Sequence, residues 1–198
     1  MKIKNLVCAA FVGGSSLLLS MPTAAQESKP PPQVISTKEE PKMIAANPAD
    51  VASLDVIVKS LYNVISGDAG VKRNWERFRS LFHPSARMIP TGKNSQTGIV
   101  GVRALLPEEY ITRSGPFLEK EGFHEVEIAR HVEQFGNIAH VFSTYEARHK
   151  LTDAKPLMRG INSFQLLNDG KRWWVITIFW SQETPEMPLP EKYLKNGN

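Results

Sequence analysis

The polar residues of the strand expected from Phe123 to Gln134 are the first candidates for chemistry. Its even positions include Val126 and Ile128, so we expect this face to be buried, and His124 and Arg130 share it. A histidine can act as a general acid or base, and an arginine can stabilise a developing negative charge. The simpler alternatives are an Arg130 ion pair with a helix carboxylate and a His124 ring that reaches water.

A tyrosine on the next expected strand, over 138–149, completes a possible catalytic set. Tyr145 shares its face with Ala139, Val141 and Ala147, which would line a pocket, and its hydroxyl could donate to a ligand carbonyl. The alternative is a tyrosine satisfied by a backbone carbonyl. The sequence thus suggests His124 as acid or base, with Tyr145 and Arg130 stabilising negative charge.

A short helix expected after Pro107 offers two candidate ligand contacts. Tyr110 and Arg113 share one face of it. Glu109 lies four residues before Arg113, so an ordinary exposed ion pair is the simpler explanation of that arginine.

Three residues in other elements are candidate ligand contacts. In the strand expected over 160–167, either Asn162 or Gln165 must face inward, and we favour Asn162 as a ligand-facing amide, with internal hydrogen bonding as the alternative. Trp75 and Trp180 could form an aromatic wall of a pocket, or they could simply fill the core.

The histidines do not predict a metal site. His124 and His140 occupy even strand positions, whereas His131 and His149 occupy odd ones, and a structural zinc site needs about four converging ligands. There is no glycine-rich phosphate loop and no Ser-His-Asp pattern that stands out. We therefore expect no metal and no cofactor.

The elements that must position these residues are helices first and strands afterwards. Apolar spacing predicts helices over 47–66 and 73–82, short strands at 86–89 and 97–102, and short helices opened by Pro107 and Pro116. From Phe123 the period changes to two, which predicts four long strands at 123–134, 138–149, 160–167 and 172–182. This order predicts an α+β domain with helices packed in the concave face of a bent, mostly antiparallel sheet.

The last strand is apolar on both of its expected faces. One face would carry Trp174, Ile176, Ile178 and Trp180, and the other Trp173, Val175 and Phe179. An antiparallel sheet with one wet side should alternate more cleanly. We therefore expect a second copy of the sheet to cover the outer face in a homodimer, with a loop or the carboxy-terminal tail as the alternative cover.

The N-terminal residues have the pattern of a targeting signal followed by a linker. Lys2 and Lys4, an apolar run and Thr23-Ala24-Ala25 predict a signal peptide over 1–25, cleaved after Ala25, and hence a periplasmic or secreted protein with no stable membrane insertion after cleavage. The single cysteine, Cys8, would leave with it. Residues 26–49 are rich in proline and charge, which predicts a disordered linker.

The charge balance excludes one class of partner. The 198 residues include 24 Lys and Arg against 20 Asp and Glu. This small excess of positive charge does not indicate binding to nucleic acid.

Several local strings resemble the nuclear-transport-factor-2-like superfamily, over about residues 49–182. They are Ile65-Ser66-Gly67-Asp68, Leu81-Phe82-His83-Pro84-Ser85-Ala86, the strand from Ala139 to Tyr145, and Asp169-Gly170 followed by Trp173-Trp174-Val175-Ile176. The resemblance implies a cone-shaped fold over 50–190, with 191–198 as a tail. The chain looks most similar to secreted bacterial members of unknown function.

The resemblance does not carry over a known catalytic residue. Pro90 aligns where ketosteroid isomerases have their aspartate base, and the stretch 176–182 has no carboxylate where the cyclase branch has its acid. The fold alone implies no reaction.

Three functions therefore remain open from the sequence. The first is a module that binds a small, mostly apolar molecule. The second is a cofactor-independent lyase, isomerase or hydrolase that uses the pocket histidine, tyrosine and arginine. The third is a structural dimer whose core is filled by Trp75, Trp180 and Phe164.

Overall fold

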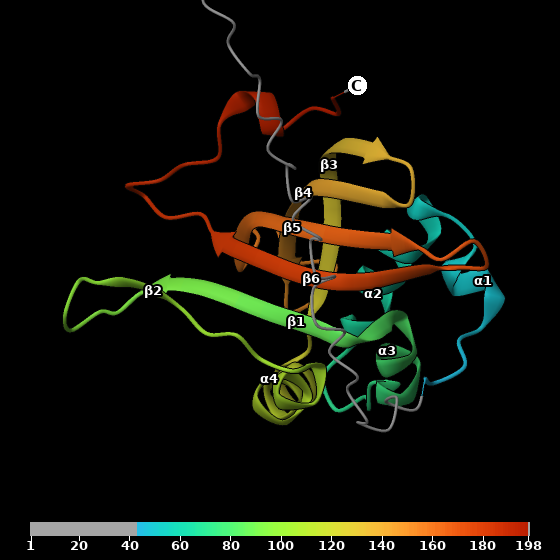
Figure 1. Ribbon diagram of the computed structural model, residues 1–198. Coiled ribbons are helices and arrows are strands. Elements are labelled where there is room, and N and C mark those ends of the chain that lie inside the picture. Colours follow the sequence, from blue (N-terminus) through green and yellow to red (C-terminus); the bar gives the residue numbers. More distant parts are fainter. Residues whose placement is uncertain (1–42, 198) are drawn as a thin grey trace, which may run out of the picture. The chain divides into compact units, whose positions relative to one another are not determined.

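The computed structural model describes residues 43–197, whose helices and strands are drawn in Figure 1. In chain order the elements are α1 Pro48–Val51, α2 Leu54–Ile65, α3 Trp75–Leu81, β1 Phe82–Lys93, β2 Val100–Val102, α4 Pro107–Glu121, β3 His124–Phe135, β4 Ile138–Arg148, β5 Met158–Asn168, β6 Trp173–Gln182 and the 3-10 helix η1 Glu191–Tyr193. The predicted signal peptide and residues 26–42 of the predicted linker lie outside the described residues. Within 43–197 no helix is long and apolar enough to cross a membrane.

Six strands form one sheet in the order β2-β1-β6-β5-β4-β3. β1 and β6 are parallel, and all other neighbouring strands are antiparallel. Helices α2, α3 and α4 lie along one side of this bent sheet (Figure 1). The predicted α+β class, with helices in the concave face of a mostly antiparallel sheet, is confirmed.

The N-terminal helical stretch, predicted as one helix, is two helices. Ser53 lies between them in an extended conformation, and its Oγ accepts a hydrogen bond from the amide of Val56. A serine that binds a backbone amide in this way starts a new helix. The apolar stripe of α2 faces the core as its spacing predicted, with Ile57, Val58, Leu61 and Val64 buried.

Helix α4 is continuous, although two short helices were predicted there. Pro116 lies inside it and removes one backbone hydrogen bond because proline has no amide hydrogen. Packing on both sides of Pro116 offsets this loss. Gly115 lies against the ring of Trp75, where a Cβ atom would be only 3.1 Å away, and Leu118 is buried.

A buried arginine fastens the end of α2 to α4. Arg73 is 7% exposed, and its guanidinium donates to the backbone carbonyls of Ile65 (2.9 Å), Gly67 (2.6 Å) and Leu118 (2.8 Å). Burial lowers the pKa of Arg73, yet the guanidinium keeps its charge because arginine is not deprotonated in proteins. These contacts fix the helices that enclose the space between α2, α4 and the sheet.

The faces of β6 differ from those expected. The pairing with β5 shifts so that Val175 faces Leu166 and Thr177 faces Gln165, which leaves Ile176 as an extra, bulged residue. A bulge reverses which positions point inward. The inner face therefore carries Trp173, Val175, Ile178 and Trp180, and the outer face carries Trp174, Thr177 and Phe179.

The outer sheet face is thus less apolar than the sequence suggested. Trp174 is 4% exposed, with the Arg172 guanidinium 3.5 Å from its ring centroid and its Nε1 donating to Asp169 (2.8 Å). Phe179 remains 43% exposed. The argument for a second copy on this face is correspondingly weaker, and the homodimer stays a prediction.

The carboxy-terminal segment covers β3 and β4. Thr144 donates to the carbonyl oxygen of Tyr193 (2.6 Å), whose ring packs edge-on against Phe142 and His131. The amide of Gly197 donates to the carbonyl oxygen of Arg130 (3.0 Å). The tail that the sequence offered as an alternative cover therefore occupies this part of the outer face.

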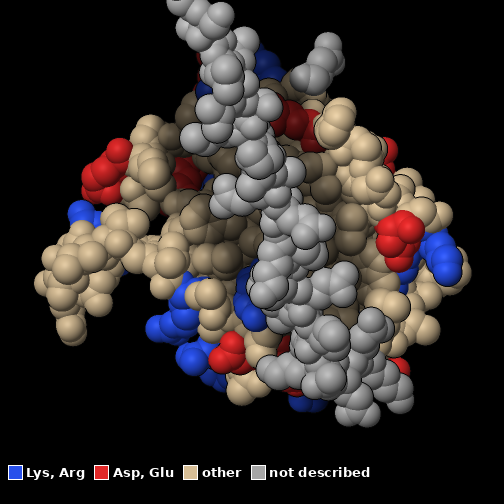
Figure 2. Space-filling view, in the orientation of Figure 1, with Lys and Arg blue, Asp and Glu red and all other residues tan. Residues whose placement is uncertain are grey.

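The β1–β2 hairpin carries exposed apolar residues directly after its polar turn. Ile99 and Val100 are 69% and 72% exposed, and the arm projects at the left of Figure 2 as a largely uncharged surface. Strand β2 is the edge of the sheet. None of these residues lines the cavity described below.

Candidate functional site

A β-bulge in β3 decides which of its polar residues face the helices. Near the hairpin Arg130 pairs with Ser143, a register that would place Ile128 opposite Tyr145 if it continued. The register instead shifts, and Glu127 pairs with Tyr145. Ile128 is the extra residue and is 37% exposed. The inward positions are therefore odd before the bulge and even after it.

Because of this bulge, the residues of β3 that point inward are not those that the sequence predicted. Val126 was expected to be buried and is 40% exposed, whereas Glu125 was expected outside and points inward. His124 and Arg130 do not share one face, because the bulge lies between them. The physical reason is that the apolar residues around the bulge lie on the outer side of an edge strand.

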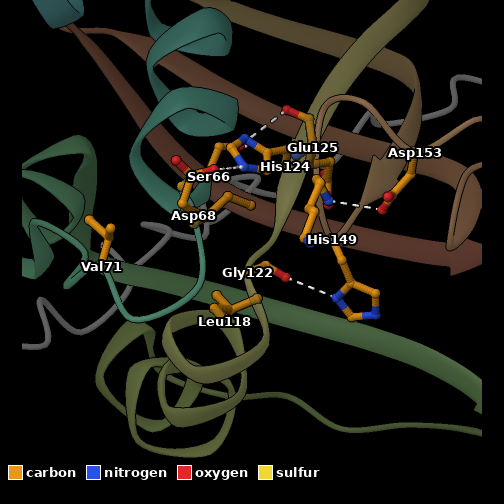
Figure 3. Close-up of polar contacts among 12 residues, drawn as sticks. Ser66, Asp68, Val71, Leu118, Gly122, His124, Glu125, His149 and Asp153 are labelled. Carbon is orange, nitrogen blue, oxygen red and sulfur yellow. Dashed lines mark hydrogen bonds and ion pairs between the residues drawn. The ribbon is translucent and has the colours of Figure 1, made fainter.

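The beginning of β3 is held by the chain that follows α2. The amide of Gly67 donates to the carbonyl oxygen of Phe123 (2.8 Å), and the amide of Phe123 donates back to Gly67 (3.0 Å). Ser66 Oγ accepts from the amide of Glu125 (3.0 Å) and donates to the carbonyl oxygen of Tyr62 (2.7 Å). Figure 3 shows Ser66, Asp68 and His124 around this junction. The backbone of Glu125 is thereby fixed against α2.

A cavity of about 330 Å³ lies between the helices and the inner sheet face. Its walls are mostly apolar and come from α2, α3, α4 and every strand except β2. They consist of Leu61, Tyr62, Ile65, Phe78, Met88, Tyr110, Ser114, Phe117, Leu118, Phe123, Glu125, Tyr145, Met158, Asn162, Phe164, Ile178 and Trp180. The alternative of a core plugged by tryptophans and Phe164 therefore fails, because Trp180 and Phe164 line an open cavity.

The polar side chains that line this cavity carry a carboxyl group, an amide, tyrosine hydroxyls and the hydroxyl of Ser114. Asn162 Nδ2 donates to Glu125 Oε1 (3.1 Å) and to the hydroxyl of Tyr62 (3.2 Å). Among the described residues, the hydroxyls of Tyr110 and Tyr145 have no hydrogen-bond partner, and neither oxygen is sealed from the cavity. These two hydroxyls and the carboxyl group are available to a bound molecule.

Desolvation raises the pKa of Glu125, Tyr110 and Tyr145. Desolvation raises the pKa of Glu125 to about 7, and the hydrogen bond from Asn162 only partly opposes it. Desolvation and the nearby Glu125 carboxyl raise the pKa of Tyr110 and of Tyr145 well above the usual value. Near neutral pH the tyrosines are hydrogen-bond donors, while Glu125 exists in both protonation states.

The neighbouring carboxylate, Glu127, has a different environment. It accepts hydrogen bonds from Arg130 Nε (2.9 Å) and from Ser143 Oγ (2.5 Å), and Arg130 also pairs with Asp55 (2.7 Å). The Ser143 hydroxyl in turn contacts that of Tyr62 (2.6 Å). Glu127 is thus a paired carboxylate, and Glu125, two residues away, has no cationic partner within residues 43–197.

Four of the eight predicted site residues line the cavity. They are Tyr145, Tyr110, Asn162 and Trp180. The structure places Asn162 inward as expected, but its amide is already bound to Glu125 and Tyr62. Trp180 packs edge-on to Tyr110, with ring centroids 6.3 Å apart.

The other four predicted residues lie outside the cavity. His124 pairs with Asp68 (2.9 Å) and Arg130 with Glu127, and both line a second, polar groove along α2 and β3, which Tyr62 and Glu125 also line. Arg113 is exposed on α4. Trp75 donates from Nε1 to Glu119 (2.9 Å) and packs on Phe78. The expected grouping of His124, Arg130 and Tyr145 around one cavity is therefore not formed.

Two important cavity residues were missed from the sequence. Glu125 was placed on the outer face because the bulge was not anticipated. Tyr62 was not singled out because it lies among the apolar residues of α2. One pattern in the sequence could have indicated that Glu125 points inward. Glu125 and Glu127 are two residues apart and therefore share a face, and they lie opposite the inward residues of β4. Among the described residues no group of three His, Cys, Asp or Glu is arranged to hold a metal ion.

Comparisons with known proteins identify the fold and not the activity. No family model and no curated protein matches the sequence. Among solved structures, a Nostoc punctiforme protein of unknown function with a cystatin-like fold has 11% identity and a TM-score of 0.51, covering 70% of this chain and 94% of its own.

Two further structures are nuclear-transport-factor-2-like proteins of unknown function. The one from Silicibacter pomeroyi has 12% identity and a TM-score of 0.46, with 67% and 94% coverage of this chain and its own. The one from Methylobacillus flagellatus has 15% identity and a TM-score of 0.40, with 67% and 95% coverage. The match to the Nostoc punctiforme structure, which is described as having a cystatin-like fold, agrees with the α+β fold of this chain.

The raised pKa of Glu125 has a consequence for stability. The folded protein binds the Glu125 proton more tightly than the unfolded chain, so stability falls as the pH rises from about 4.5 to about 7. Glu125→Gln cannot titrate and should lose less stability over this window. At about 1.4 kcal/mol per pKa unit, the difference between the two proteins should change by on the order of 3 kcal/mol. Urea unfolding at several pH values measures it.

The matched control is Glu133→Gln, which alters an exposed carboxylate of the same strand. It should follow the wild-type pH dependence. Identical pH profiles for the wild type and Glu125→Gln would contradict the assignment of Glu125 as a half-buried carboxyl group without a cationic partner.

Proposed function

We propose that the cavity binds a small, mostly apolar organic molecule that carries one polar group. Its volume of about 330 Å³ lies within the range of ligand pockets, at the lower end. The fold is consistent with small-molecule binding. The observation that carries the proposal is the cluster of Glu125, Tyr110 and Tyr145, whose polar atoms face an otherwise apolar space.

The polar cluster gives the ligand an orientation. The hydroxyls of Tyr110 and Tyr145 have no hydrogen-bond partner within the described chain and are accessible from the cavity, so they can bond to a molecule that enters it. A ligand whose polar atom lies between these hydroxyls and Glu125 would supply them. Its apolar part would then contact Phe78, Phe164 and Trp180.

A second candidate function is proton transfer, and the pKa of Glu125 supports it. A carboxyl group with a pKa of about 7 is suited to act as a general base near neutral pH. Glu125 would take a proton from the carbon next to a ligand carbonyl, the C–H electron pair would form a C=C bond to the carbonyl carbon, and the π pair of the C=O bond would move to the oxygen. Hydrogen bonds from Tyr110 and Tyr145 would stabilise that oxygen. Returning the proton to another carbon would complete an isomerisation.

Secretion and a homodimer are further proposals for this protein. The periplasmic or secreted location is supported by the sequence of residues 1–25. The dimer is supported by the exposed Phe179 on the outer sheet face.

Blocking the cavity should abolish binding. Ser114 lines it from the half-buried side of α4, so Ser114→Trp should fill its space and reduce the affinity for 2-phenylethanol at least about tenfold. Thr112→Trp is the matched control, because Thr112 is exposed on the same helix. Ligand-observed NMR measures both. Equal affinity in the two variants would show that the alcohol binds elsewhere.

Proton transfer is tested with a ketone in heavy water. The protein should accelerate exchange of the hydrogens next to the carbonyl of 4-phenyl-2-butanone, followed by NMR, with the rate rising as Glu125 ionises near pH 7. Glu125→Gln should lower the enzymatic rate by about a hundredfold or more, and Glu133→Gln should leave it unchanged. Exchange that persists in Glu125→Gln would remove this candidate.

A further inference from the structure

The charges around the cavity are all of one kind. Among the lining residues in the described part of the chain there is no lysine, arginine or histidine, and Glu125 is the only carboxylate. An anionic ligand would meet no positive partner there and would be repelled by an ionised Glu125. The lining therefore selects neutral or positively charged molecules.

Glu125 lacks the counter-charge that the neighbouring carboxylates have. Glu127 pairs with Arg130, and Asp50 forms a double contact with Arg77 (2.8 Å to each oxygen). The carboxyl group of Glu125 receives only the neutral amide of Asn162. Lys59 and Arg130 line the groove that Glu125 also lines, yet within residues 43–197 no cation forms an ion pair with Glu125. Charges that are shielded from water are normally paired, so a cationic ligand would supply the missing partner.

The surroundings of Glu125 fit an ammonium group. Besides the carboxylate, the hydroxyl oxygens of Tyr110 and Tyr145 can accept hydrogen bonds, which matches the several N–H donors of an ammonium. The remaining walls are rich in aromatic rings, and ring faces attract cations. These rings include those of Phe78, Phe117, Phe123, Phe164 and Trp180.

We propose that the ligand is an organic amine, whose ammonium group pairs with Glu125 and whose apolar body lies against the aromatic walls. This inference rests on the proposed binding function and names the class of its ligand. Binding requires the Glu125 carboxylate, so it releases the Glu125 proton at acidic pH.

Titratable and charged groups surround Glu125 on two sides. In the cavity they are Tyr62 on α2, Tyr110 on α4 and Tyr145 on β4, and all three hydroxyls have raised pKa values and stay protonated. In the groove that Glu125 also lines they are Asp55 and Lys59 on α2 and His124, Glu127 and Arg130 on β3, where His124 contacts Asp68 and Arg130 contacts Glu127 and Asp55. The affinity for an amine should therefore fall as the pH is lowered below about 7.

Three probes with the same phenyl body test the inference. They are 2-phenylethylamine, 2-phenylethanol and phenylacetate, which present an ammonium, a hydroxyl and a carboxylate. Calorimetric or NMR titration of the protein at pH 7.5 should give an affinity for the amine at least about tenfold above that for the alcohol, and the weakest binding for phenylacetate. The preference for the amine should shrink at pH 5.

Variants separate the role of Glu125 from the shape of the cavity. Glu125→Gln should lose the tenfold preference and still bind the alcohol within about twofold of the wild type. Glu133→Gln should keep the preference. Equal or tighter binding of the alcohol or phenylacetate to the wild type, or a preference that persists in Glu125→Gln, would overturn the amine inference alone. If none of the three probes binds at millimolar concentration, the binding function itself is overturned.

Discussion

The arrangement of the cavity depends on one extra residue in an edge strand. Because of the bulge at Ile128, Glu125 and Glu127 point toward the helices on the N-terminal side of the bulge. Arg130 points toward them on its C-terminal side. A regular strand could not do this, because alternate residues would remain on one face throughout. The bulge therefore creates a paired carboxylate next to an unpaired one.

The unpaired carboxylate gives the cavity its chemical character. Its backbone is held to α2 through Ser66, and Arg73 fastens the end of α2 to α4, so the walls around Glu125 are fixed. The side chain is half-buried, and its hydrogen-bond partner is the amide of Asn162. Desolvation then dominates the ionisation of Glu125, as expected for a carboxyl group in an apolar site. Proton transfer and cation binding both follow from this property.

The fold could be predicted from the sequence more fully than the site. The helical stripe of α2 and the two-residue period after Phe123 predict the α+β class, because burial of apolar side chains fixes both patterns. Tyr145 and Asn162 were placed correctly, since β4 and β5 are regular there. Glu125 and His124 were misplaced, because the alternation of apolar residues does not reveal a bulge. The same limit applied to Ile176 in β6.

The most direct test of this account is the ionisation of Glu125 itself. Side-chain carboxyl carbons can be followed by NMR as the pH is varied, with Glu125→Gln identifying the signal. The account predicts a midpoint near 7 for Glu125 in the ligand-free protein. A midpoint near 4.5, the ordinary value for a glutamate, would show that the carboxyl group is solvated or paired and would contradict the central claim.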